Sequence, residues 1–132
     1  MTNDAPLLQV EGLRKQYALP ARGAALPWRR PRRVLQAVDG VGFTLQRGEA
    51  LGLVGESGSG KSTTAGLIAR LIDADAGRIR FEGEDIAGTP ARRAAGAPWR
   101  ARIQMVFQDP ADSLDPRASA GDAIAAPLRR LT

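Results

Sequence analysis

The sequence predicts an α/β fold, and three observations lead to this prediction. Short apolar segments with the composition of β-strands recur along the chain, for example at residues 7–13 and 103–107. Apolar side chains at helical spacing follow residue 61, and residues 120–131 also indicate a helix. A glycine-rich loop, residues 55–63, stands between a strand-like and a helix-like segment. Strands and helices arranged around such a loop are typical of the α/β class.

The segments before the loop predict three strands. Residues 7–13 alternate partly between apolar and polar side chains, which indicates a first strand. Residues 18–33 contain three prolines and five arginines, and we expect them to form an insertion loop. The strand pattern resumes at residues 34–45, with a break predicted at Asp39-Gly40. Residues 49–54 are expected to form a short buried strand that leads into the glycine-rich loop.

The segments after the loop predict helices and further strands. Residues 61–72 carry leucine and isoleucine at helical spacing and predict the first helix. Residues 78–81 alternate as a strand does, and residues 87–98 show only a weak helical tendency. Residues 103–107 predict a short strand that ends at Gln108-Asp109-Pro110. Residues 120–131 are expected to form a helix with Gly121 as its weak point.

The glycine-rich loop carries the clearest functional signal. It fits the phosphate-binding pattern G-x-x-x-x-G-K-[ST] in a strand-loop-helix context, which argues against a glycine-rich turn that matches by chance. Its glycines allow the backbone to turn so that successive N–H groups surround a phosphate. A helix that begins near Lys61 would add the positive end of its dipole. We expect nucleotide to bind at Gly55, Glu56, Ser57, Gly58, Ser59, Gly60, Lys61, Ser62 and Thr63.

Composition limits the other functions that the chain could have. There is no cysteine and no histidine, which removes disulfides, cysteine-based metal sites and the usual general base. The net charge of +5 equals the charge of the five arginines within residues 21–33, so the rest of the chain is neutral and offers no broad nucleic-acid surface. No apolar run reaches membrane-spanning length, and we expect a soluble or peripheral protein.

Several segments together resemble one family. The chain is similar to the N-terminal half of the ATP-binding subunit of an ABC transporter, because residues 55–64 match that family's phosphate loop and residues 106–110 resemble its glutamine loop. Residues 111–117 and 121–128 are similar to the di- and oligopeptide importer branch, whose tracts nickel and glutathione importers share. The resemblance implies the P-loop NTPase fold of the ABC ATPase type over residues 1–132, truncated before the family's signature motif.

The resemblance also implies roles for individual residues. Tyr17 would stack on the adenine ring of ATP, although it could be an ordinary tyrosine. Gln108 would contact Mg²⁺ and the attacking water, or it could simply be a polar residue at a strand end. Lys61 and Gln108 are the implied catalytic residues, and Ser62 and Gln108 the implied ligands of the Mg²⁺ that accompanies ATP. Asp109 could instead imitate the Mg²⁺-linked aspartate of other phosphate-loop enzymes, an alternative that the surrounding residues disfavour.

The motifs that the family uses for turnover do not occur in these residues. The Leu-Ser-Gly-Gly-Gln signature, a hydrophobic run ending in Asp-Glu, and the switch histidine are all absent. We therefore expect this chain alone to bind ATP with little or no hydrolysis, since nothing clear polarises the attacking water. An incomplete sheet is also expected to expose apolar surface.

The resemblance implies an ATP-binding subunit that couples ATP binding and hydrolysis to the import of peptides or similar small solutes. Its partners would be transmembrane permease subunits and a second ATPase subunit, at the cytoplasmic face of the inner membrane, with indirect membrane contact and no specific nucleic acid. Two alternatives stay open: another phosphate-loop NTPase, such as a small kinase or GTPase, or a non-enzymatic nucleotide- or partner-binding fragment. Residues 21–33 form either a solvated loop or a patch for anionic lipid or nucleic acid anchored by Trp28.

Overall fold

An antiparallel sheet, with one α-helix and two 3₁₀ helices against it, forms the body of the molecule. The computed structural model describes residues 5–19, 33–109 and 114–131. Its four strands lie in the order β2-β1-β3-β4, all pairs antiparallel. The strands are β1 (Leu8–Ala18), β2 (Val34–Leu45), β3 (Ala76–Phe81) and β4 (Glu84–Asp85). The helices are α1 (Lys61–Ile68), η2 (Ala91–Gly96), η3 (Pro98–Arg102) and α2 (Ala120–Leu131).

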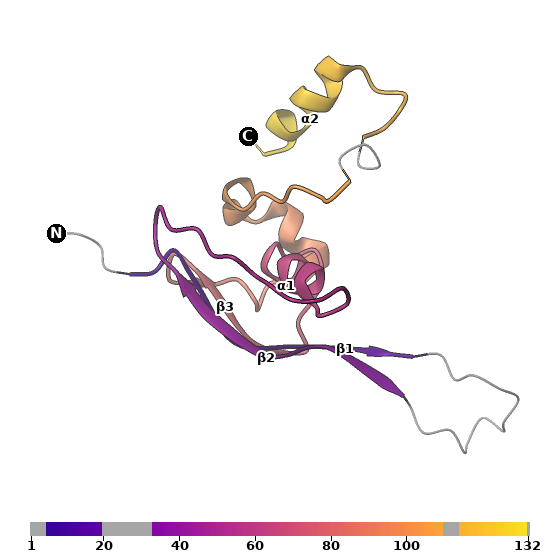
Figure 1. Ribbon diagram of the computed structural model, residues 1–132. Coiled ribbons are helices and arrows are strands. Elements are labelled where there is room, and N and C mark those ends of the chain that lie inside the picture. Colours follow the sequence, from indigo (N-terminus) through magenta and orange to yellow (C-terminus); the bar gives the residue numbers. More distant parts are fainter. Residues whose placement is uncertain (1–4, 20–32, 110–113, 132) are drawn as a thin grey trace, which may run out of the picture.

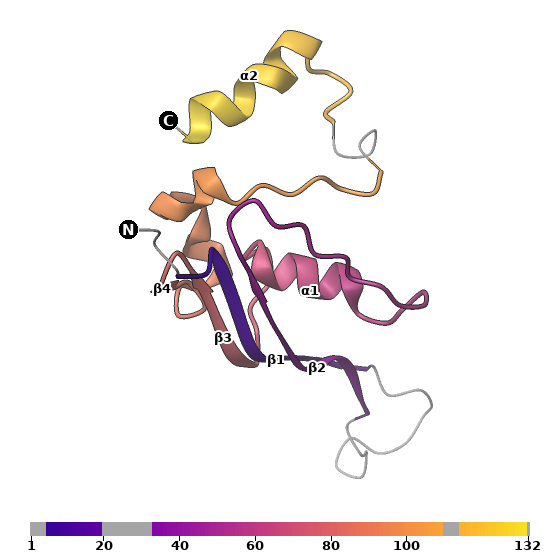
Figure 2. The same cartoon turned by 60° about the vertical axis from the view of Figure 1, so that its left-hand side comes forward.

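One face of the sheet and α1 enclose the hydrophobic core. Leu13 from β1, Ile79 from β3 and Leu67 from α1 are fully buried, and Trp99 from η3 is buried beside them. The burial of such large apolar side chains supplies the main driving force that holds α1 against the sheet. Figures 1 and 2 show α1 and the 3₁₀ helices near the sheet, whereas α2 is set apart from it.

A bulge in β1 explains why its sequence alternates only in part. Val10 and Leu13 are both buried although they are three residues apart, because the pairing register with β2 shifts between them. Gly12 has a φ of 56° within this bulge, a conformation that costs glycine little. Gly77 of β3 lies against it, since a Cβ on Gly77 would come within 2.6 Å of the Cα of Leu13. The bulge therefore keeps both apolar side chains in the core.

Three predicted strands and both predicted helices are present. The elements at residues 34–45 and 120–131 have the predicted bounds, and the other three have revised bounds. The first strand extends beyond residue 13 to Ala18, and the backbone N–H of Leu19 donates to the carbonyl oxygen of Arg33 at 2.8 Å. The predicted insertion loop therefore begins after residue 18, and most of it, residues 20–32, lies outside the described residues. At the break predicted for Asp39-Gly40, β2 continues as one strand, but its pairing with β1 shifts register there and Gly40 has a φ of 67°.

Helix α1 ends earlier than its apolar spacing predicts. Arg70 has a φ of 52°, in the left-handed region. The N–H of Arg70 donates to Leu67 and that of Leu71 donates to Gly66, at 3.1 and 2.9 Å. These two bonds are the Schellman arrangement that ends a helix and satisfies its last carbonyl groups. The weak helical tendency predicted for residues 87–98 corresponds to η2 and the start of η3.

Two predicted strands do not form. Residues 49–54 and 103–107 have no strand assignment, and several of their apolar side chains face solvent. Val54 is 94% exposed and Val106 is 89% exposed. A strand persists only where a neighbouring strand takes up its backbone hydrogen bonds, and neither segment has such a neighbour in the described part of the chain. The composition of both segments is typical of a strand, but in the described residues no neighbouring strand pairs with either of them.

Candidate functional site

The glycine-rich loop leads directly into α1. Gly58 and Gly60 have φ values of 81° and 91°, which side chains other than glycine rarely adopt. The backbone N–H and the hydroxyl of Thr64 both donate to the carbonyl oxygen of Gly60, at 2.8 and 3.0 Å. Thr64 is itself buried, so these bonds fix the start of the helix. The first turn of α1 contains no acidic residue that would repel an anion.

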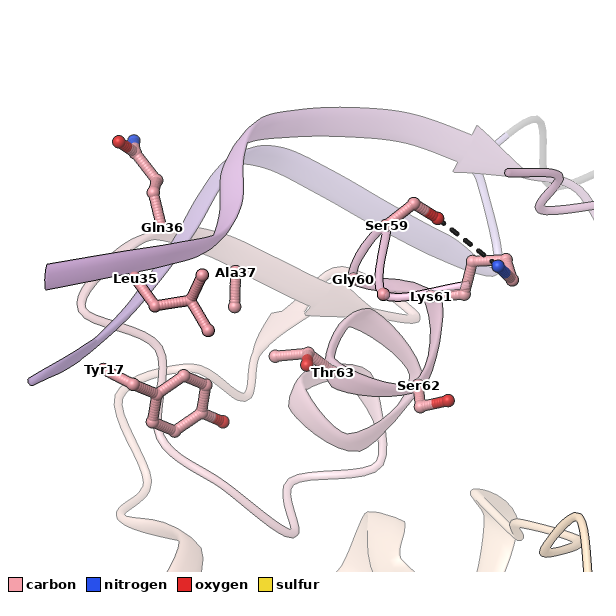
Figure 3. A pocket seen from close by; sticks show the side chains of 10 residues that line it. Tyr17, Leu35, Gln36, Ala37, Ser59, Gly60, Lys61, Ser62 and Thr63 are labelled. Carbon is pink, nitrogen blue, oxygen red and sulfur yellow. Dashed lines mark hydrogen bonds between the residues drawn. The ribbon is translucent and has the colours of Figure 1, made fainter. Parts of the chain in front are cut away.

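Lys61 folds back across the loop that precedes it. Its ammonium group donates to the carbonyl oxygens of Gly55 and Glu56, both at 2.6 Å. It also lies 3.3 Å from the hydroxyl of Ser59, the contact drawn in Figure 3. The loop thus wraps around a positive charge, and an anion that enters it meets both this cation and the N-terminal end of a helix.

A cavity of about 300 Å³ lies next to this loop. Tyr17 of β1 and the 58–63 segment both line it, although they are far apart in the sequence. Figure 3 shows the Tyr17 ring and Leu35 on the side of the cavity where the strands run, with Ser62 and Thr63 at the start of α1. The structure brings them together because β2 pairs with β1 and also contacts α1.

Most of the predicted binding residues meet at this cavity. Tyr17, Gly58, Ser59, Gly60, Lys61, Ser62 and Thr63 line it. Gly55 and Glu56 contribute through the carbonyl groups that bind Lys61, and Ser57 belongs to the same turn without lining the cavity. Gln108 does not line the cavity and lies in the irregular segment after residue 103. Its predicted role stays a prediction.

The sequence did not indicate three residues that complete the cavity wall. Leu35, Gln36 and Ala37 of β2 line it, and Leu35 is the pairing partner of Tyr17. The composition of residues 34–45 predicted a strand. The pairing register between β1 and β2 could not be predicted from the sequence, because residues 19–33 separate the two strands. A hairpin with a short turn would have fixed the register from the sequence.

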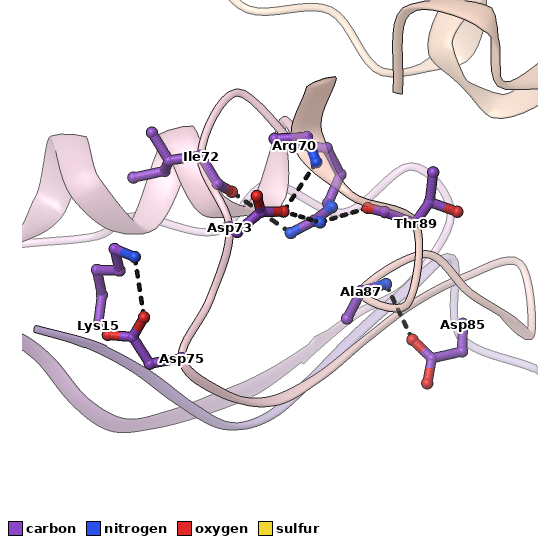
Figure 4. A network of polar contacts seen from close by, with 9 residues as sticks. Lys15, Arg70, Ile72, Asp73, Asp75, Asp85, Ala87 and Thr89 are labelled. Carbon is purple, nitrogen blue, oxygen red and sulfur yellow. Dashed lines mark hydrogen bonds and ion pairs between the residues drawn. The ribbon is translucent and has the colours of Figure 1, made fainter. Parts of the chain in front are cut away.

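The side chain of Asp73 ties the segment after α1 to its surroundings (Figure 4). Asp73 accepts hydrogen bonds from the backbone N–H of Ala91 and from the guanidinium group of Arg70, both at 2.8 Å. These two contacts, the Ala91 N–H first, lower the pKa of Asp73. The Arg70 side chain is 1% exposed, and it also donates to the carbonyl oxygens of Ile72 and Thr89. This network fixes where the chain turns towards β3.

Comparison with known proteins establishes the family. Residues 38–129 match the ABC transporter family. The chain belongs to the ABC transporter family. It is 50% identical over 123 residues to a probable peptide ABC transporter ATP-binding protein, y4tS, of Sinorhizobium fredii, covering 92% of this chain and 33% of that protein. It is 52% identical over 97 residues to a putative peptide import ATP-binding protein of Brucella abortus, covering 74% of this chain and 29% of that protein.

Comparison with solved structures confirms the predicted fold class, that of ABC-type ATP-binding cassettes. A dimer of the ATP-binding cassette MJ0796 in a post-hydrolysis state, bound to ADP and Pi, superposes with a TM-score of 0.75. The sequences are 21% identical, and the match covers 95% of this chain and 48% of that one. The chain thus shares the fold of the matched part of an ABC ATPase cassette. It spans about a third of the length of the curated relatives that it matches. No helix in the described residues is long and apolar enough to span a bilayer.

Proposed function

We propose that this chain is the nucleotide-binding part of an ABC transporter subunit and that it binds Mg²⁺-ATP. One observation carries the proposal: a single cavity of about 300 Å³ is lined by an aromatic ring, Tyr17, and by the phosphate-type loop at residues 58–63. A nucleotide has both an aromatic base and a polyanionic end, and the two parts of the cavity match these chemistries.

Different residues of the cavity would contact different parts of the nucleotide. The first-turn N–H groups of α1 have no partner within the helix and can donate to phosphate oxygens. Lys61 would move its ammonium group from the carbonyl oxygens of Gly55 and Glu56 to the terminal phosphates. Tyr17 would stack on the base, and its cross-strand partner Leu35 would contact the base or the ribose.

The residues present also fit Mg²⁺ bound through the nucleotide. Among the described residues there is no group of three or more acidic, histidine or cysteine side chains that could hold a metal without the nucleotide. Mg²⁺ retains water ligands and commonly binds through substrate phosphates with one or two protein oxygens. The hydroxyl of Ser62, which lines the cavity, would be one such ligand, and Gln108 a second. When bound, the ion would neutralise charge on the phosphates.

We further propose that the whole subunit couples ATP hydrolysis to the import of peptides or similar small solutes. The support comes from the two relatives, since one is named as a probable peptide ABC transporter ATP-binding protein and the other as a putative peptide import ATP-binding protein. Lys61 and Gln108 would act in hydrolysis, but the chain alone would turn over little ATP. Its partners would be transmembrane permease subunits and a second ATPase subunit, at the cytoplasmic face of the inner membrane.

Calorimetry with Mg²⁺-ATP tests the binding proposal directly. Lys61→Ala should abolish measurable binding of Mg²⁺-ATP. Arg117→Ala is the control and should bind Mg²⁺-ATP as the parent chain does, because the Arg117 side chain is 90% exposed and is distant in sequence from the loop. Circular dichroism of both variants checks that they are folded. A folded parent chain that does not bind ATP, or a Lys61→Ala variant that binds it equally well, would contradict the proposal.

Asp109 provides the test of the competing assignment. If residues 106–110 act as a glutamine loop, Asp109→Asn should leave Mg²⁺-ATP binding within about threefold of the parent, less than 1 kcal/mol. A loss as severe as that of Lys61→Ala would show that Asp109 carries the Mg²⁺-linked function instead. ATP-independent binding of a protein or nucleic-acid partner by residues 21–33, which lie almost entirely outside the described residues, would favour the non-enzymatic alternative.

A further inference from the structure

A partly buried ion pair lies beside the aromatic side of the cavity. The ammonium group of Lys15 lies 3.0 Å from the carboxylate of Asp75. Figure 4 shows the two side chains pointing toward each other. The Lys15 side chain is only 15% exposed, although lysine is rarely buried unless it is paired. Asp75 belongs to the turn between α1 and β3, so the pair connects this turn to β1.

Asp75 also holds the backbone of β1 at this position. Pairing between β1 and β3 ends at Arg14 and Ala76. Beyond that point Asp75 replaces a strand partner: its carboxylate accepts a hydrogen bond from the N–H of Gln16 at 2.6 Å, and its own N–H donates to Arg14 at 3.0 Å. The N–H of Gln16, followed by the ammonium group of Lys15, lowers the pKa of Asp75 and so favours the charged carboxylate. Both the backbone and the side chain of Lys15 are therefore fixed.

Lys15 in turn covers one face of the Tyr17 ring. Its ammonium nitrogen lies 5.5 Å from the ring centroid, within the range of a cation–π contact. Tyr17 itself is 39% exposed and lines the cavity. A ring face that is covered by an ammonium group is closed to a second aromatic ring, so a base must stack on the opposite face.

We propose that Lys15, held by Asp75, is a positioning residue that orients Tyr17 for the nucleobase. The inference rests on the proposed nucleotide function and adds to it a residue pair outside the phosphate loop. The turn after α1 would then take part in base recognition, because its Asp75 holds the Lys15 ammonium group in place and Lys15 in turn holds the Tyr17 ring. Lys15 is not expected to contact the phosphates, since it does not line the cavity.

Three variants of the chain test this inference with two ligands. Lys15→Met keeps the apolar stem and removes the charge, and Asp75→Asn removes the charge that holds Lys15. Arg14→Met is the matched control, because Arg14 is also a β1 cation in an ion pair, with Asp39 at 3.4 Å, but does not line the cavity. Affinity is measured for Mg²⁺-ATP and for tripolyphosphate, which lacks the base.

The expected result is a selective loss. Lys15→Met and Asp75→Asn should each weaken ATP binding about two- to fivefold, the scale of one cation–π contact, and leave tripolyphosphate binding unchanged. Arg14→Met should change neither. In a Tyr17→Ala background, Lys15→Met should have no further effect on ATP binding, because the ring through which it acts is gone.

Other results would overturn the inference in distinguishable ways. An equal loss for ATP and tripolyphosphate would indicate a merely structural role, and an undiminished effect in the Tyr17→Ala background would show that Lys15 does not act through the ring. If the parent chain is folded and binds neither ligand, the proposed function fails, and this inference with it. If it binds both and Lys15→Met matches Arg14→Met, only this inference fails.

A spectroscopic measurement tests the ring position without any ligand. Tyr17 is the single tyrosine of the 132 residues, so 3-fluorotyrosine labelling gives one ¹⁹F signal. Lys15→Met and Asp75→Asn should both shift this signal in the absence of ligand, and Arg14→Met should not. An unchanged signal in both test variants would contradict the positioning role even if a variant has lost too much stability for binding measurements.

Discussion

The backbone of Gly60 packs directly against the carbonyl group of Ala37. A Cβ atom on Gly60 would lie 2.1 Å from the Ala37 carbonyl oxygen, far inside van der Waals contact. The φ of 91° at Gly60 adds a second requirement for glycine. This contact joins the phosphate-type loop to β2, so that the loop and the strand residues line the same cavity.

Gly60→Ala is therefore expected to displace the loop from β2. We expect ATP binding to weaken at least about tenfold, which corresponds to 1.4 kcal/mol or more. The control is Gly88→Ala, because a Cβ on Gly88 would meet nothing within 4 Å. Calorimetry of both variants with Mg²⁺-ATP checks the prediction, and equal affinities in the two variants would refute it.

Leu67 links α1 to the sheet, and its truncation should destabilise the fold. The side chain is fully buried, so Leu67→Ala should lower the free energy of unfolding by about 2–5 kcal/mol through lost burial and a residual cavity. Leu114→Ala, at a leucine that is 58% exposed, should change it by no more than about 0.5 kcal/mol. Urea unfolding followed by circular dichroism measures both values. Similar losses in the two variants would argue against the described core.

Asp73 should make part of the stability depend on pH in the acidic range. Its pKa is lowered in the folded chain by the Ala91 N–H and by Arg70, so unfolding favours proton uptake. The stabilisation is complete above the unfolded pKa of about 3.9 and is lost as the pH falls through the lower folded pKa. Asp73→Asn should be less stable than the parent at pH 7 and should lose less stability on acidification below about pH 4. Denaturant titrations between neutral and strongly acidic pH would show this, and parallel curves would contradict it.

The two segments that do not form strands should bind hydrophobic dyes. Val54 and Val106 are 94% and 89% exposed, and exposed apolar patches promote association. The double variant Val54→Ser, Val106→Ser should bind less 1-anilinonaphthalene-8-sulfonate and remain monomeric to higher concentration. Val34→Ser, at a valine of β2 that is 50% exposed, serves as the control. If dye fluorescence and light scattering are equal in the double variant and in Val34→Ser, these two segments are not the surface that binds the dye and promotes association.

Local sequence predicted much of the fold, for reasons that particular residues illustrate. The sequence Gly58 to Lys61 predicted the loop and the helix that begins at Lys61. In the structure both Gly58 and Gly60 have the positive φ that such a loop requires. The end of that helix was not predicted, because an arginine, not a glycine, adopts the left-handed conformation at residue 70. The Arg70 side chain is buried against partners at residues 72, 73 and 89, and such contacts cannot be read from spacing.

The sequence by itself determined the α/β class, the family and the phosphate-type loop, because these depend on residue types at fixed short spacings. Only the tertiary structure decided that Tyr17 pairs with Leu35, that Lys15 lies over the Tyr17 ring and that Ala37 requires a glycine at residue 60. It also decided that residues 49–54 and 103–107 are not strands. The physical reason is the same in each case: register, ring position and strand formation depend on partners distant in the sequence, whereas turns and helix starts depend on neighbours.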